Sequence, residues 1–393
     1  MATAYAVIGA NFGDEGKGLC VDRLSTKGSL VIRHNGGAQA GHTVETDGKR
    51  FVFHQLSSGS FRSADTFWAE TFLPDLFKLT GEVEDFYRTA GYLPALFSHP
   101  DARVTVIDDV IINMALETSR GEARHGSCGM GINEAFLRSG AGFGLTVYDV
   151  KSVSAEALYT RLRALRDEYC HIRLDALGLR LKDMGEYGEL LSDSGVLYNA
   201  AEGMKRGAEL VELKDAGKLF TEYESVVFEG AQGLLLDSEN KRFAPNVTAS
   251  RTGLNNPVTL SKKYGLELKK VFYVMRSYVT RHGAGELPEE REPVSVGSIV
   301  KDGTNVKNEW QGSLRYGLYE SPEALATSLL SDMEGYNGEA ALFITHLNET
   351  GGYVRFAAGD IPAEKLISHP AFFGRLSETC LSATRYAADV KVR

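Results

Sequence analysis

The stretch AYAVIGANFGDEGKG, residues 4–18, joins a short aliphatic run to a glycine-rich loop. The run Ala4–Ala10 is apolar at nearly every position, which is typical of a strand buried on both faces of a parallel sheet. The glycines of the loop let backbone N–H groups approach an anion closely, and Lys17 adds a positive charge. The stretch therefore predicts a buried strand followed by an anion-binding loop.

The same kind of run recurs along the chain, and each copy ends in glycine or polar residues. We expect further strands at Ser29–Arg33, Val104–Ile107, Ser225–Phe228, Lys270–Met275 and Ala341–Thr345. Helical patterns lie between them, for example at Ala155–Asp167 and Pro322–Leu330. This alternation predicts an α/β fold, with a largely parallel central sheet flanked by helices. We expect a single domain over residues 1–393, with helical elaborations near 66–100 and 152–218.

Composition excludes several classes of function. The 393 residues are 43% hydrophobic and 24% charged, ordinary values for a soluble globular protein. With 43 basic and 52 acidic residues, the net charge of -9 argues against a general nucleic-acid or membrane-surface binder. We find neither an apolar run of about eighteen residues nor a signal peptide. The four cysteines show no Cys-x-x-Cys spacing, so we expect a cytoplasmic protein without a disulfide framework or zinc site.

The loop after the first strand is similar to a P-loop but departs from it. Asn11 stands where the first glycine is expected, and Gly18 replaces the Mg²⁺-binding Ser or Thr. Asp14 and Glu15 would repel phosphate, so a carboxylate here suggests an Mg²⁺ ligand or a general base. The alternative is an ordinary helix N-terminus, where acidic residues favour the helix dipole. The loop alone leaves both interpretations open.

A second polar loop, NGGAQAGHT at residues 35–43, directly follows the second predicted strand. Its imidazole, His42, lies beside glycines, an amide and a hydroxyl, and such groups can donate to phosphate oxygens. A lone histidine is otherwise commonly a structural residue. Because ligands bind at the carboxyl ends of parallel strands, we expect the two loops to form one site.

Several motifs, in order, resemble the adenylosuccinate synthetases. These motifs are GDEGKG at 13–18, AGHT at 40–43, FEGAQG at 228–233 followed by LLD at 235–237, VTAS at 247–250 and YVTRHGAG at 278–285. The last two correspond to VTSS and YTTRVGAG in the family. The resemblance extends from residue 5 to about residue 348.

The resemblance implies a two-step ligation that needs Mg²⁺. A base removes the N1 proton of a 6-oxopurine nucleotide while a nucleoside triphosphate phosphorylates O6, and the amino group of L-aspartate then displaces that phosphate. It implies Asp14 as base, His42 as acid on the transferring phosphoryl group, and Asp14 with the Gly41 carbonyl as metal ligands.

The resemblance also implies three sets of binding residues. The triphosphate set is Gly13, Glu15, Gly16, Lys17, Gly18, Gly41, His42, Thr43, Arg315, Thr345, His346, Asn348 and Ser382. The purine monophosphate set is Asn11, Asp14, Lys17, Gln39, Ala40, Ser127, Cys128, Arg138, Gln232 and Thr248. The aspartate set is Gly312, Ser313 and Arg315. Arg138 is expected to reach the substrate of a neighbouring subunit, which implies a homodimer, although a solvated surface arginine is the alternative.

The departures from the family bear on the substrates. The family reads guanine with Thr-Lys-x-Asp, whereas this chain has Thr345-His346-Leu347-Asn348. An amide matches adenine N6–H and N1, so Asn348 favours ATP or dATP over GTP; the alternative is a strand-end cap. Gln39 replaces an asparagine in the substrate pocket, and Cys128 and Met130 replace a threonine and an arginine. The arginine-rich aspartate loop is reduced to QGSLR at 311–315, and LSATR at 381–385 matches the terminal base-binding turn only weakly.

The chain keeps the family's core motifs but lacks its guanine-binding aspartate. In this combination it resembles the phage branch that acts on dGMP to give N6-succino-2-amino-2′-deoxyadenylate. If a phage encodes the chain, the expected location is the host cytoplasm. The alternatives are an ordinary IMP- and GTP-dependent enzyme and a nucleotide-binding regulator without catalysis. The expected partners are a purine monophosphate, ATP, dATP or GTP, and L-aspartate, with no nucleic acid or membrane.

Overall fold

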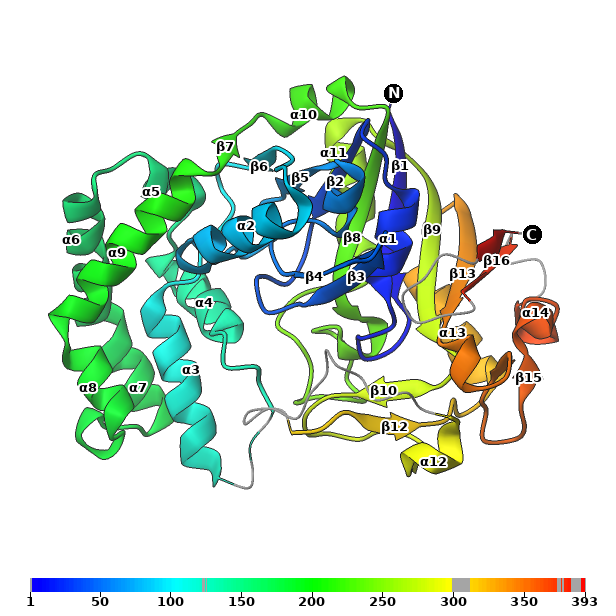
Figure 1. Cartoon of the computed structure of the whole chain (residues 1–393). Helices are drawn as coiled ribbons and strands as arrows, with labels where there is room; N and C mark the ends of the chain where they lie inside the picture. The colour runs from blue at the N-terminus through cyan, green and yellow to red at the C-terminus, as the bar shows by residue number, and fades with distance from the viewer. Residues whose placement is uncertain are drawn as a thin grey trace.

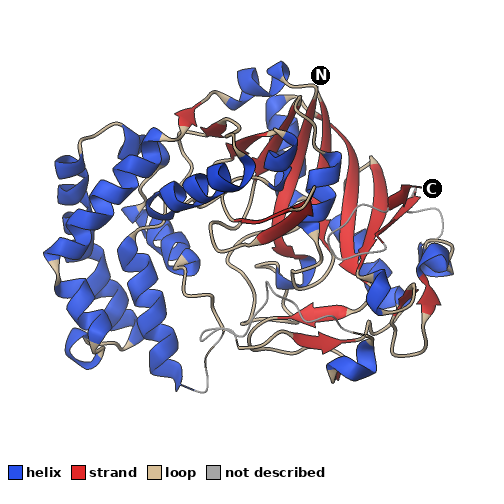
Figure 2. Ribbon diagram, viewed as in Figure 1, coloured by secondary structure: helices blue, strands red, loops and turns tan. Residues whose placement is uncertain are grey.

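The core of the fold is a ten-stranded sheet (Figures 1 and 2). The computed structural model describes residues 2–121, 124, 126–298, 312–372, 376, 378–382 and 390–392. The spatial order is β17 (Val390–Val392), β16 (Glu378–Ser382), β13 (Glu339–Thr345), β9 (Glu267–Arg276), β1 (Thr3–Gly9), β8 (Ser225–Gly233), β2 (Ser29–Arg33), β5 (Asp65–Trp68), β6 (Leu96–Ser98) and β7 (Glu212–Leu213). Every neighbouring pair is parallel except β16 and β17. The predicted α/β fold with a largely parallel sheet is confirmed.

The central strands form where aliphatic and β-branched residues are buried on both sheet faces. In β1, Ala6, Val7 and Ile8 are fully buried, and all of β2 is buried. Five of the predicted strands correspond to β1, β2, β8, β9 and β13. The carboxyl ends of these strands lie at one edge of the sheet, as the sequence predicted.

The predicted strand at Val104–Ile107 is wrong. Residues 104–106 form a connecting segment, and α3 (Ile107–Arg120) begins at the last residue of the run. The Asp109 carboxylate accepts the Val106 backbone N–H at 2.9 Å and so caps the helix. Residues 104–106 are buried beside the start of the helix. Their aliphatic side chains reflect this burial, and the prediction mistook them for the aliphatic run of a buried strand.

A layer of helices covers the β5–β7 end of the sheet and has its own apolar core (Figure 1). It contains α2 (Leu76–Ala90), α3, α4 (Ile132–Arg138), α5 (Val147–Lys151), α6 (Ala155–Leu165), α7 (His171–Leu177), α8 (Glu186–Ser192) and α9 (Ser194–Glu209). The expected helix 155–167 is α6, which ends at Leu165 and continues as a π-helical turn, Arg166–Cys170.

The prediction of a helical elaboration near 66–100 needs correction. Only α2 is helical there, because β5 and β6 flank it and extend the central sheet. Phe67 and Trp68, which fall within the region expected to be helical, are fully buried strand residues. In the region 152–218, helices α6 to α9 and α10 (Ala216–Leu219) predominate, although β7 joins the sheet edge.

Smaller elements surround the sheet, and the hairpin of β3 (His42–Thr46) and β4 (Lys49–Phe53) among them packs against the helical layer through Val44 and Phe53. This hairpin follows β2, and a small antiparallel sheet consists of β10 (Val279–Arg281), β12 (Arg315–Gly317) and β11 (Glu290–Arg291). Helices α1 (Lys17–Leu24), α11 (Asn255–Tyr264), α12 (Pro293–Val296), α13 (Pro322–Asp332) and α14 (Ala363–Leu366) and the short strands β14 (Tyr353–Val354) and β15 (Ile361–Pro362) complete the described chain. Within that part of the chain, no helix is both long and apolar enough to cross a bilayer.

Candidate active site

A cavity of about 770 Å³ opens where the loops after the central strands converge. Most residues expected to bind nucleotides line it. They are Gly13, Asp14, Glu15, Gly16, Lys17, Gly18, Gln39, Ala40, Gly41, His42, Thr43, Ser127, Cys128, Gln232, Thr248 and His346. The loops after β1, β2 and β8 therefore meet at one place, although long stretches of sequence separate them.

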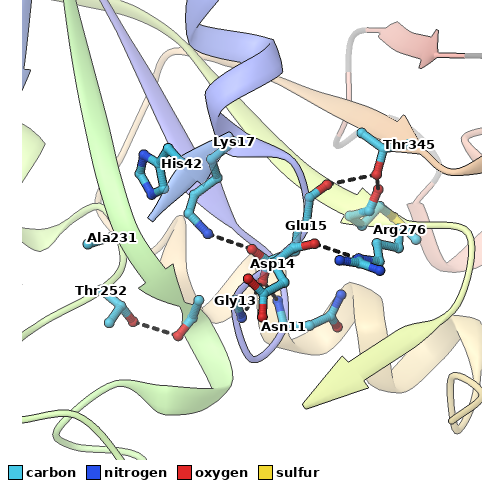
Figure 3. A network of polar contacts seen from close by, with 12 residues as sticks. Asn11, Gly13, Asp14, Glu15, Lys17, His42, Ala231, Thr252, Arg276 and Thr345 are labelled. Carbon is cyan, nitrogen blue, oxygen red and sulfur yellow. Dashed lines mark hydrogen bonds and ion pairs between the residues drawn. The ribbon is translucent and has the colours of Figure 1, made fainter. Parts of the chain in front are cut away.

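Glu15 organises the loop after β1 from within (Figure 3). Its Oε1 accepts the backbone N–H groups of Asn11 at 3.0 Å and Gly13 at 2.8 Å. Its Oε2 accepts from Lys17 Nζ at 2.5 Å, and both side chains are buried. Glu15 thus acts as a scaffold for the loop and holds the lysine beside the cavity.

Asp14 adopts a left-handed backbone conformation, with φ of 59°. Arg276 Nε donates to the Asp14 carbonyl at 2.5 Å, and Thr345 Oγ1 donates to the Glu15 carbonyl at 2.7 Å (Figure 3). The ends of β9 and β13 therefore fix the loop from behind. The Asp14 carboxylate remains 27% exposed at the cavity, where it can accept a proton or bind a cation.

His42 faces the same cavity from the start of β3 and is oriented by Glu229. Its Nδ1 donates to Glu229 Oε1 at 2.6 Å. Ser58 donates its backbone N–H to Glu229 Oε2 at 3.1 Å and its hydroxyl to Oε1. Glu229 lies within the FEGAQG motif, to which no orienting role was assigned from the sequence.

Burial and neighbouring charges shift the pKa values of both Glu229 and His42. Burial raises the pKa of Glu229, but the buried Arg33 cation and the His42 hydrogen bond outweigh this effect and lower the pKa to about 2. Burial lowers the pKa of His42, against the opposing effect of Glu229. The ionised Glu229 is thus placed to stabilise an imidazolium at His42 once an anionic phosphoryl group arrives.

The cavity wall also contains basic side chains to which the sequence motifs gave no role, among them Arg276, Arg281 and His282. Arg281 donates to the carbonyls of Glu286 at 2.6 Å and Asn246 at 2.7 Å, and its guanidinium lies 4.6 Å from the Phe12 ring centroid. Arg276 is the last residue of the buried strand β9. A positive charge at that strand end could have indicated from the sequence that Arg276 belongs to the site.

The loop 126–131 forms the wall of the cavity nearest the helical layer. Ser127 Oγ donates to Asn113 Oδ1 at 2.8 Å, and Glu117 Oε2 accepts the Gly126 N–H at 3.0 Å. Burial raises the pKa of the Cys128 thiol, so this side chain is a neutral, apolar part of the wall. Helix α3 therefore positions this loop.

The structure contradicts the surface alternative for Arg138. The side chain is 0% exposed, pairs with both Asp109 oxygens at 2.9 Å, and donates to the carbonyls of Val104 at 2.8 Å and Phe143 at 2.6 Å. These contacts commit the guanidinium to packing α4 against α3. Arg138 is therefore buried in this chain and is not a surface arginine, while its role toward a neighbouring subunit and the homodimer stay predictions.

Two further predictions need correction. Asn11 is buried beneath the loop, donates from Nδ2 to Tyr319 OH at 2.9 Å, and does not line the cavity. Arg315 pairs with Glu290, at 2.8 Å between Nε and Oε1, and donates to the carbonyls of Gly283 at 3.1 Å and Gly285 at 2.8 Å. Its donors are engaged by β11 and by the loop after β10.

The remaining predicted residues lie away from the cavity lining. Gly312 and Ser313 precede β12. Asn348 is exposed on a 3-10 turn, Leu347–Glu349, directly after β13, and Thr345 is buried behind the β1 loop. The backbone of Ser382 ends β16, whereas its side chain, together with Gln311 and residues 383–385, lies outside the described residues.

The residues present fit an Mg²⁺ ion shared with substrate phosphates. Asp14 offers a partly exposed carboxylate, and Gly41 lines the same cavity. Mg²⁺ in nucleotide sites commonly takes one or two carboxylates, with the rest of its ligands from phosphates and water. A protein cage is therefore unnecessary here.

Comparison with known proteins supplies independent information. A family model described as adenylosuccinate synthetase matches residues 6–345. Adenylosuccinate synthetases of Teredinibacter turnerae and of Buchnera aphidicola are 32% and 28% identical over 299 and 292 residues, each match covering 74% of this chain. The chain spans 66% of the length of these relatives, just under two thirds.

Two solved structures share the fold. One is a fully ligated adenylosuccinate synthetase from Plasmodium falciparum, with a TM-score of 0.64 and 22% identity, covering 88% of this chain and 77% of that one. The other is the succinoaminodeoxyadenylate synthetase of cyanophage S-2L, bound to dGMP and to dATP as an energy donor. It has a TM-score of 0.63 and 16% identity, covering 100% of this chain and 95% of that one.

Proposed function

The chain belongs to the adenylosuccinate synthetase family, and on that premise we propose that it is a carbon–nitrogen ligase joining L-aspartate to C6 of a 6-oxopurine nucleotide. The observation that carries the proposal is the meeting of Asp14, Lys17 and His42 in one cavity, with His42 on the ionised Glu229. These groups supply a proton acceptor, a phosphate-binding charge and a donor for a phosphoryl group.

The residues divide the chemistry as follows. Asp14 removes the N1 proton of the purine, which makes O6 nucleophilic toward the terminal phosphate of the triphosphate. Lys17 and the N–H groups of the glycine loop hold the phosphates, and His42 donates to the transferring group. The aspartate amine then attacks C6 and displaces phosphate. Mg²⁺, when bound at Asp14 and Gly41, would neutralise phosphate charge.

We further propose dGMP as the purine substrate, ATP or dATP as the donor, and N6-succino-2-amino-2′-deoxyadenylate, ADP or dADP, and phosphate as products. Asn348 supports the adenine donor, because an amide complements adenine, whereas the family's aspartate complements guanine. The cyanophage structure supports the dGMP branch through its fold alone, which matches this chain over its whole length.

The second candidate is an adenylosuccinate synthetase acting on IMP with GTP. The names of the bacterial relatives favour it. The two candidates share one mechanism and one cavity, and they differ in the 2-amino and 2′-hydroxyl groups of the purine nucleotide and in the donor base.

The test is a competition of substrates on the full-length chain. Inorganic phosphate release and aspartate incorporation are measured with dGMP or IMP, each with ATP, dATP or GTP, in the presence of Mg²⁺. Highest kcat/KM for dGMP with an adenine donor is the expected result. Faster turnover of IMP with GTP would select the second candidate. Nucleotide binding without phosphate release in any combination would indicate a regulator that has lost catalysis.

A further inference from the structure

His282 lies beside Asp14, the proposed base, in the wall of the cavity. Its Nε2 lies 3.4 Å from Asp14 Oδ2, and the imidazole is 16% exposed. It follows β10, whereas Asp14 follows β1, so residues far apart in the sequence meet at this point. Lys17, the cation of the loop 13–18 itself, pairs with Glu15 instead.

The backbone on both sides of His282 is well anchored. Arg281 precedes it and is fixed by two backbone carbonyls and the Phe12 ring. Gly283, with φ of 71°, follows it and packs against Gly126, where an added Cβ would lie 2.6 Å from the Gly283 Cα. The imidazole therefore approaches Asp14 from a rigid wall.

Asp14 needs such a support. Its backbone lies in the left-handed region, and the backbone carbonyl is held by Arg276. These constraints fix the main chain but leave the side-chain torsions of the carboxylate free to rotate. A base must lie within hydrogen-bond reach of the proton it removes, and misplacement by about 1 Å is costly.

We infer that His282 is a positioning residue, which donates from Nε2–H to Asp14 Oδ2 and so turns Oδ1 toward the purine. This inference rests on the proposed function of Asp14 as the base. The family motif YTTRVGAG has valine at this position, and valine cannot donate a hydrogen bond. The chain thus carries an orienting group for its base that an aliphatic side chain would not provide.

The experiment compares His282→Val with His282→Gln, which restores an N–H donor. We expect His282→Val to lower kcat about 10- to 100-fold, with the Kd for dGMP within about threefold of wild type. His282→Gln should recover most of the loss. His171→Val, an exposed histidine on α7, is the control, and we expect no change. Thermal unfolding confirms that each variant is folded.

A crystal structure of His282→Val with dGMP supplies a readout independent of turnover. The Asp14 carboxylate should adopt a different or a mixed rotamer there. Wild-type kcat in His282→Val, or loss of dGMP affinity with kcat retained, would overturn the inference, the latter because His282 would then contact substrate directly. If wild type turns over neither dGMP nor IMP, the proposed function fails, while the Asp14 rotamer still tests the positioning role.

Discussion

Asp14 combines a strained backbone with a chemically exposed carboxylate, so its backbone and side-chain roles can be separated. Asparagine tolerates the left-handed region at least as well as aspartate does, and Asp14→Asn should therefore fold normally. It removes the proton acceptor, and we expect turnover to fall by about 10²–10⁴-fold or more. Asp47→Asn, at another positive-φ aspartate with φ of 50°, is the matched control and should remain active. Near-normal turnover of the Asp14 variant would remove this residue from the mechanism.

Asn348 is the residue on which the donor preference depends. If its amide reads adenine, Asn348→Asp should weaken ATP and improve GTP, because a carboxylate accepts from guanine N1–H and N2–H but cannot donate to adenine N1. Because Asn348 is exposed, we expect each lost hydrogen bond to the base to cost about 0.5–1.5 kcal/mol. The measurement is the ratio of kcat/KM for ATP and GTP in both proteins. An unchanged ratio would place base recognition elsewhere, and a wild type that already prefers GTP would refute the adenine interpretation.

His34, at the end of β2, provides a pH test of the core beside the site. Burial, with a smaller contribution from Arg33, lowers its pKa from 6.5 to about 3. The unfolded chain therefore binds a proton that the folded chain does not, and stability falls as pH drops through 6.5 toward 3. The loss is about 1.4 kcal/mol per pH unit for each such group.

We therefore expect urea unfolding of His34→Phe to show a smaller loss of free energy between pH 7.5 and 5.5 than wild type. The pKa of His42 is also lowered, so part of the change in unfolding free energy with pH should remain in the His34 variant. Glu229 contributes only below its unfolded pKa of about 4.5, outside this range. His34→Gln repeats the test if phenylalanine packs poorly, and an undiminished slope in both variants would show that His34 is not the titrating group.

At the scale of elements, two helices of the outer layer pack through glycine. An added Cβ on Gly207 of α9 would lie 1.9 Å from the Leu76 carbonyl of α2. Gly207→Ala must push the helices apart, and we expect it to destabilise the protein by about 1–3 kcal/mol. Gly81→Ala on exposed α2 surface meets nothing within 4 Å and should stabilise by about 0.5–1 kcal/mol. Equal effects in chemical denaturation would contradict this packing.

The sequence predicted elements best where one physical signal dominates. Buried parallel strands have continuous aliphatic runs, so β1, β2, β8, β9 and β13 could be found. At Val104 the same signal came from a buried connection, and α3 was fixed by Asp109, a cap that the aliphatic pattern does not reveal. The short strands β5 and β6 were hidden among aromatics that suit either structure.

For the site as well, local sequence signals predicted some residues and tertiary contacts decided the others. Loops that directly follow predicted strands could be brought together by the rule of strand ends, and Asp14, Lys17, His42 and Gln232 do line one cavity. The pairing of Arg138 with Asp109 and of Arg315 with Glu290 could not be predicted, because these partners lie elsewhere in the sequence. A side chain's nearest charge depends on tertiary packing, which one sequence does not specify.

At the scale of the whole molecule, the cavity lies between two apolar cores. The sheet core carries the glycine-rich loop, residues 13–18, whereas the helical core carries α3, which positions loop 126–131. The region 152–218 is joined to α3 by Arg166, which pairs with the buried Asp108 at 2.6 Å. The two walls of the site therefore depend on different parts of the fold.

Removing Arg166 should therefore act on one wall of the site only. Arg166→Met leaves Asp108 buried without its cation, and we expect a loss of about 3–5 kcal/mol in the free energy of unfolding. Because α3 holds loop 126–131, KM for the purine monophosphate should rise more than KM for the triphosphate. Arg180→Met removes an exposed pair with Asp183 and should cost at most about 1 kcal/mol, with both KM values unchanged. If Arg166→Met raised the two KM values equally, the helical layer would support the cavity as a whole and not the monophosphate wall alone.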